Sequence, residues 1–159
     1  MKQIDLNRLF IQDQYHPLVY KLRNDANGAH DIAFFNSYIH DATIFLDNIT
    51  FKRAKIDIPL ERICWELKDS DLETHACKSH IFINNVTDYF FTFNRTLLKN
   101  WTLPSEVSIS DFSLSKTETC SVLKFSLFFE SRFPDFEMSI MVAGGKNVIT
   151  IKDEINTFS

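Results

Sequence analysis

Short runs of β-branched and aromatic residues follow one another from Tyr38 onward in this 159-residue chain, separated by Asn, Asp, Pro and Ser. Such runs with polar breaks are typical of strands. No stretch of ordinary helical length separates them, so a parallel sheet would lack its crossover helices. We therefore predict a mainly β fold with antiparallel strands, arranged as a two-layer sandwich or roll. The expected strands are Thr43–Arg53, Ile56–Ile58, Ile63–Leu67, Ile81–Val86, Tyr89–Phe93, Val107–Leu114, Val122–Phe129, Phe136–Val142 and Val148–Lys152.

The connections between these strands carry their own signals. Gly144-Gly145-Lys146-Asn147 is a strong turn sequence because glycine adopts positive φ without steric cost. It predicts a C-terminal hairpin between the last two strands. The polar stretch Lys68–Ser79 is expected to be a loop within the domain.

The N-terminal residues show a helical spacing instead. Leu6, Leu9 and Phe10 fall at i, i+3 and i+4, and Leu18 and Leu22 repeat this spacing after Pro17. Because proline cannot donate a backbone hydrogen bond, two short helices are expected rather than one. Residues 1–30 are thus predicted to be a helical segment packed on a single β-rich domain, residues 1–159.

Composition narrows the classes of function. A chain with 45% hydrophobic and 24% charged residues, including 16 Phe, can bury one large aromatic core. Its three glycines cannot form the loops that cradle phosphates in P-loop or dinucleotide-binding folds. The net charge of −4, with scattered cations, argues against nucleic acid and is compatible with a basic protein partner.

Location and redox state follow from the N-terminus and the cysteines. The first 18 residues contain acidic and polar side chains and no continuous apolar segment, which argues against a signal peptide or membrane span. Cys64, Cys77 and Cys120 are odd in number and far apart, which suits a reducing compartment. A cytoplasmic location without membrane partners is expected.

The segment from His75 to His80 contains the ligand types that zinc accepts, namely His75, Cys77 and His80. Its spacing matches no standard zinc ligand pair, and Lys78 would place a cation inside the cage. In an extended chain His75 and Cys77 share a face, whereas His80 points the other way. We expect no metal or cofactor here, and a solvent-exposed loop that tolerates His75→Ala.

Other reactive groups have structural interpretations. Cys64 or Cys77 could act as a thiolate beside a histidine, but a buried cysteine acting as a small hydrophobe is the simpler interpretation. The carboxylate pairs Glu130 with Asp135 and Asp153 with Glu154 flank strand ends, where charged groups are normally solvated.

His40 and Asp41 directly precede an apolar run and form the candidate binding site. In the structural interpretation Asp41 turns the entering backbone while His40 packs on the sheet edge. In the functional interpretation they form an oriented His–Asp couple for acid–base work. Because neighbouring residues of a strand point to opposite faces, adjacency argues against a catalytic pair.

The stretch from Phe35 to Ile44, FNSYIHDATI, resembles the F-x-S-x-x-HDA-x-I pattern that opens the first strand in a family of small bacterial β-rich proteins. That family includes immunity proteins of polymorphic-toxin systems. The segments IFINNVTDYFFTFN and FEMSIMVAGGKNVIT follow in a similar order to the family's strands. The resemblance implies a non-enzymatic cytoplasmic protein that binds a partner such as a toxin domain, and it assigns no catalytic residues.

Two hypotheses of function follow. The first is a non-enzymatic protein-interaction module of immunity type. The alternative is a small-molecule-binding or hydrolytic β domain, with an aromatic-lined cavity between the layers and His40 or His80 at its mouth. The sequence does not determine the oligomeric state.

Overall fold

The computed structural model describes residues 19–23, 29–63, 76–93, 105–129, 132–143 and 148–154. These residues form one ten-stranded antiparallel sheet and a single α-helix, which confirms the mainly β, antiparallel prediction. The strands are β1 Val19–Arg23, β2 Thr43–Phe45, β3 Thr50–Lys52, β4 Lys55–Ile63, β5 Ala76–Ile83, β6 Val86–Phe93, β7 Glu106–Lys116, β8 Cys120–Phe129, β9 Arg132–Ala143 and β10 Val148–Asp153. The α-helix is α2, Ala29–Ile39, and a 3-10 turn, Leu46–Asn48, separates β2 from β3.

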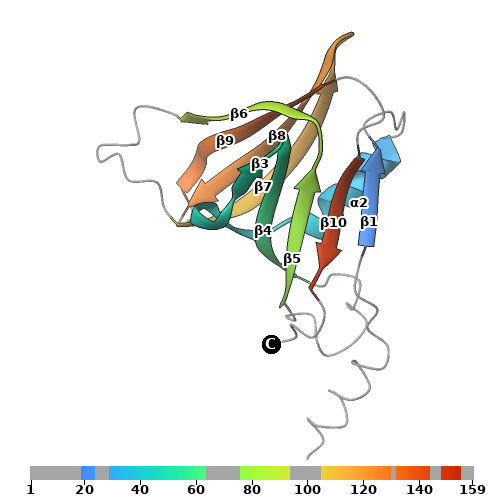
Figure 1. Ribbon diagram of the computed structural model, residues 1–159. Coiled ribbons are helices and arrows are strands. Elements are labelled where there is room, and N and C mark those ends of the chain that lie inside the picture. Colours follow the sequence, from blue (N-terminus) through green and yellow to red (C-terminus); the bar gives the residue numbers. More distant parts are fainter. Residues whose placement is uncertain are drawn as a thin grey trace, which may run out of the picture.

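The sheet bends around one core. Its order is β1-β10-β5-β4-β2-β7-β8-β9-β6, with β3 paired to β4 beside this path. Figure 1 shows β4, β5 and β10 side by side, β6 and β9 crossing the upper left of the view, and α2 behind β1 and β10. The helix contacts β1, β4 and β7. The molecule is therefore a roll whose inner face is shared by both halves of the sheet.

Alternating side chains produce this inner face. In β4, Ile56, Ile58 and Leu60 are buried, whereas Lys55 and Asp57 point to the outer face. Between the layers Phe112 lies 4.9 Å from Phe35 of α2 and 5.0 Å from Phe125 of β8, measured between ring centroids. Each fully buried side chain of this size contributes about 1.5–3 kcal/mol of hydrophobic stabilisation. Phe35, Phe112, Phe125 and Phe136 thus serve the core, whereas Phe34, Phe51, Phe82 and Phe90 are exposed.

Several local predictions were wrong. The expected strand Ile56–Ile58 and the start of Ile63–Leu67 belong to one strand, β4, and the expected strand Ile81–Val86 is divided at Asn84–Asn85 between β5 and β6.

Residues Val19–Arg23 form strand β1, which pairs with β10, rather than a helix. Tyr20 and Leu22 face the core and Lys21 faces outward, so tertiary pairing decides against the helical spacing. The remaining residues of the predicted N-terminal helices, 1–18, lie outside the described residues. The α-helix lies later, over Ala29–Ile39.

The expected strand Thr43–Arg53 is interrupted by the 3-10 turn at Leu46–Asn48. The break leaves Pro59 of the neighbouring strand β4 unpaired on the side of β2 and β3. On that side of β4, β3 pairs as far as Asp57 and β2 begins pairing at Leu60. Proline, which has no N–H, therefore lies where neither strand offers an acceptor.

The expected C-terminal hairpin is absent. Strand β9 pairs with β8 and β6, whereas β10 pairs with β5 and β1 in the other half of the sheet. The predicted loop Lys68–Ser79 is also wrong from Ala76 onward, because β5 begins there. Its earlier part lies outside the described residues. Among the described residues, no helix is long and apolar enough to cross a membrane.

Candidate functional site

His40 and Asp41 lie in the turn between α2 and β2. Their side chains are 3.0 Å apart and about half exposed. Asp41 has φ 61°, the left-handed conformation that ends many helices, and its N–H donates to the carbonyl of Ile109 in β7. The Ile109 N–H in turn donates to Ala42. Because the two residues lie in a turn and not in a strand, their side chains meet, and the expectation that adjacency separates them is wrong. The backbone contacts fit the structural interpretation, in which Asp41 turns the entering backbone.

The three candidate zinc ligands do not share a face. Cys77 is buried on the inner face of β5, and His80 lies on the outer face. His75 lies outside the described residues. The parity argument is confirmed for Cys77 and His80, while the expected exposed loop is wrong at these two positions. No cluster of three potential metal ligands occurs in the described part of the chain.

His80 instead bridges three strands on the outer face. Its Nδ1 lies 2.7 Å from Asp57 Oδ1 of β4, and its Nε2 lies 2.6 Å from Glu154 Oε1 after β10. Both nitrogens donate only in the protonated ring, so this geometry suits an imidazolium between two carboxylates. The ring also stacks on Phe82, with centroids 5.5 Å apart and planes within 6°.

Two opposing effects act on this imidazole. Partial burial lowers the pKa of His80, but the hydrogen bonds and charges of Asp57 and Glu154 together outweigh it. The pKa of His80 is therefore raised above its ordinary value of 6.5. Because both ring nitrogens are hydrogen-bonded, His80 links β4, β5 and the end of β10, and neither nitrogen is positioned to act as a general base.

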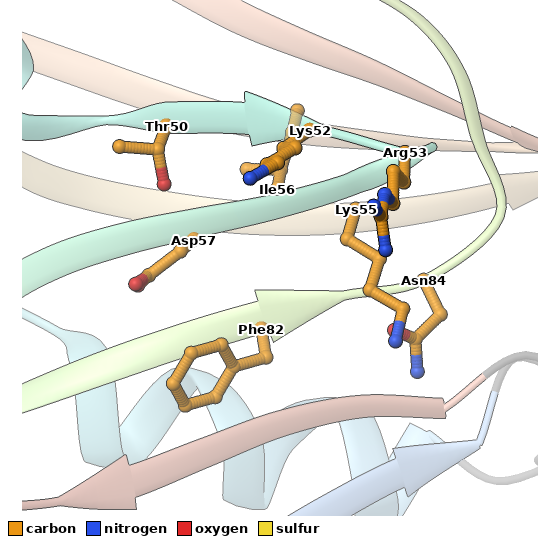
Figure 2. A pocket seen from close by; sticks show the side chains of 8 residues that line it. All are labelled: Thr50, Lys52, Arg53, Lys55, Ile56, Asp57, Phe82 and Asn84. Atoms are coloured by element: carbon orange, nitrogen blue, oxygen red, sulfur yellow. The ribbon is translucent and has the colours of Figure 1, made fainter.

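A groove of about 380 Å³ opens beside this bridge. It lies on the outer face of β3, β4 and β5 and is lined by Thr50, Lys52, Arg53, Lys55, Ile56, Asp57, Phe82 and Asn84. We call it the cationic groove. Figure 2 shows Arg53, Lys55 and Asn84 gathered at one end, Asp57 and Thr50 toward the other, and the Phe82 ring along one side. It is not the aromatic-lined cavity expected between the layers.

The cations come from the β3–β4 hairpin. Its two turn residues, Arg53 and Ala54, both have positive φ, 52° and 61°. Positive φ at both turn residues is what a type I′ turn requires. Such turns favour Asn and Gly, which tolerate positive φ, so Arg53 and Ala54 adopt it with strain. The turn is tied to the start of β6, since the Val86 N–H donates to the Ala54 carbonyl.

A second surface combines aromatic and acidic groups on β6 and β9. Phe90, 45% exposed, points outward from β6 between the exposed Asp88 and Thr92. In the register of the two strands, Asp88 lies opposite Met141 and Thr92 opposite Glu137. Lys124 lies one strand farther, opposite Ser139. We call Asp88, Phe90, Thr92, Glu137 and Met141 the acidic–aromatic face.

A buried polar cluster lies inside the roll. Arg62 of β4 donates two hydrogen bonds to Asp153 of β10, at 2.8 and 2.7 Å, and both side chains are fully buried. Ser79 of β5 also donates to Asp153, and the Tyr38 ring centroid lies 5.9 Å from the Arg62 guanidinium carbon. The expectation of a solvated Asp153 is therefore wrong.

Sequence reasoning missed this cluster and the partners of His80. One signal was available: Arg62 and Asp153 each occupy an inward position of an alternating strand, where a charge requires a partner. Their pairing depends on the order β4-β5-β10, which local sequence does not give.

Comparisons with known proteins supply no relative. No protein-family model matches the chain, and neither the curated proteins nor the solved structures contain a significant match.

Proposed function

We propose that this protein is a non-enzymatic, cytoplasmic interaction module of immunity type that binds a basic protein partner through the acidic–aromatic face. The observation that carries the proposal is Phe90, a large apolar side chain 45% exposed at the end of the sheet. Interfaces concentrate their binding energy in a few aromatic anchors surrounded by polar groups.

Charge favours a basic partner at this position. Asp88 and Glu137 lie on the same outer face as Phe90, one on each side of it along the strands. The exposed Lys124 lies on this face two strands from Phe90, so two carboxylates are accompanied by one cation. Such carboxylates steer a cationic partner and fix its orientation more than they add affinity. The chain's net charge of −4 acts in the same direction over longer distances.

The geometry of the histidines supports binding rather than catalysis. His80 is bridged by two carboxylates, and His40 pairs with Asp41 in an exposed turn whose backbone serves the fold. The resemblance of the Phe35–Ile44 segment to immunity proteins supports the same class of function and suggests a toxin domain as the partner.

Site-specific photo-crosslinking tests the proposal. A photoreactive phenylalanine analogue replaces Phe90 in one variant and Phe34 in another, in cells that naturally express the protein. Phe34 is the matched control because it is 56% exposed but lies on α2. We expect one basic protein to be captured from position 90 and not from position 34. Capture of the same proteins from both positions, or of none from position 90, contradicts the proposal.

A further inference from the structure

The cationic groove brings together three cations, Lys52, Arg53 and Lys55, with one carboxylate, Asp57, which is hydrogen-bonded to His80. No hydrogen bond or ion pair engages the side chains of Lys52, Arg53 or Lys55 among the residues that the structure describes. Lys52 and Lys55 are directly opposite each other in the β3–β4 register. Like charges in this position destabilise a sheet, so an anion bound between them would relieve the repulsion.

The end of the groove has the right donors for a phosphate. Figure 2 shows the Arg53 guanidinium, the Lys55 ammonium and the Asn84 amide at the same end of the groove that these residues line. A guanidinium donates in a planar fork that matches two phosphate oxygens, and an ammonium adds a point charge. Several positive charges suit a doubly charged phosphate monoester better than a single carboxylate.

Besides the cations and Asn84, the groove is lined by Thr50, Ile56, Asp57 and Phe82, and the Phe82 ring offers a flat apolar surface beside the Asp57 carboxylate. Phe82 is 37% exposed and lines the groove, and its ring stacks on His80. Because Asp57 and Glu154 fix His80, the Phe82 ring is supported by a rigid neighbour. A rigid exposed ring is a platform on which a planar ligand can stack. The volume of about 380 Å³ lies in the range of small-ligand sites.

We propose that the cationic groove binds a phosphate monoester with an aromatic body, its phosphate at Arg53, Lys55 and Asn84 and its ring on Phe82. The groove lies on the outer face of β3, β4 and β5, and none of its lining residues belongs to the acidic–aromatic face. The inference therefore does not depend on the proposed protein partner.

Calorimetric titration tests this with phenyl phosphate, inorganic phosphate and phenol. We expect phenyl phosphate to bind most tightly, since only this probe engages both ends of the groove. The variant Arg53→Ala/Lys55→Ala should weaken phenyl phosphate binding by about tenfold or more, because it removes the guanidinium fork and the ammonium that hold the phosphate. Phe82→Ala should reduce the affinity for phenyl phosphate to that for inorganic phosphate.

The control is Lys124→Ala, an exposed lysine on β8 in the other half of the sheet. It should leave the affinity unchanged, and thermal melting verifies that all variants are folded. A phosphotyrosine peptide is a further probe: tighter binding than phenyl phosphate assigns the site to a phosphorylated protein, and equal or weaker binding assigns it to a small molecule. Equal binding of phenyl phosphate to wild type and Arg53→Ala/Lys55→Ala, or no binding at all, overturns the inference.

Discussion

Replacing Asp153 by asparagine should strongly destabilise the protein. Asp153 accepts two hydrogen bonds from the buried Arg62 guanidinium and one from Ser79. Asparagine has nearly the same shape but no charge and only one acceptor oxygen. The substitution therefore leaves a positive charge inside the roll without its counter-ion.

The magnitude follows from the burial of both groups. Removing one partner of a buried ion pair costs about 3–5 kcal/mol, because the remaining charge stays in a poorly solvating environment. Ser79→Ala removes one hydrogen bond to the same carboxylate and should cost about 1–3 kcal/mol. Domains of this size have about 5–15 kcal/mol of stability in total, so Asp153→Asn consumes a large part of it.

Urea unfolding followed by circular dichroism measures these differences. The double variant Arg62→Met/Asp153→Leu removes both charges. Replacing both partners of a buried ion pair costs little, whereas removing one costs about 3–5 kcal/mol, so this variant should be at least about 2 kcal/mol more stable than Asp153→Asn. A cost below about 1 kcal/mol for Asp153→Asn would refute the reasoning. The reasoning would also be refuted if the loss of unfolding free energy in the double variant equalled the sum of the losses in Arg62→Met and Asp153→Leu.

Two further predictions concern the outer face. Because the pKa of His80 is raised in the folded state, its bridge stabilises the fold fully below the unfolded value of 6.5 and the contribution is lost as pH rises through the raised pKa. The difference in unfolding free energy between wild type and His80→Gln should therefore be larger at about pH 5.5 than at about pH 9, and a constant difference would contradict the bridge. Ala54→Gly should stabilise the protein by up to about 1 kcal/mol, since glycine adopts its φ of 61° without strain. A lower unfolding midpoint in urea would show that the hairpin turn is not strained.

Period-two patterns were sufficient to find most of the strands. Phe136, Met138, Ile140 and Val142 occupy alternate positions of the predicted strand Phe136–Val142, and all four lie buried in β9. The same rule, applied to Cys77 and His80, places their side chains on opposite faces. These predictions succeed because burial of one sheet face imposes the alternation residue by residue.

Local sequence patterns do not give the order of the strands in the sheet, and the errors follow from this. The Gly144–Asn147 turn signal is local, yet β9 and β10 belong to opposite halves of the sheet. The residues of β1 have a spacing compatible with a helix, but they form a strand because they pair with the edge of β10. Likewise, the Asp57–His80–Glu154 bridge depends on strands far apart in the sequence.

The most direct test of the central claim is the affinity of the partner captured at position 90 for three purified forms of the chain. Isothermal titration should show binding to wild type and to Phe34→Ala with the same dissociation constant. Phe90→Ala should bind about tenfold or more weakly, as expected for the loss of an aromatic anchor. Equal affinity of wild type and Phe90→Ala, or a loss confined to Phe34→Ala, would contradict the assignment of the acidic–aromatic face as the binding surface.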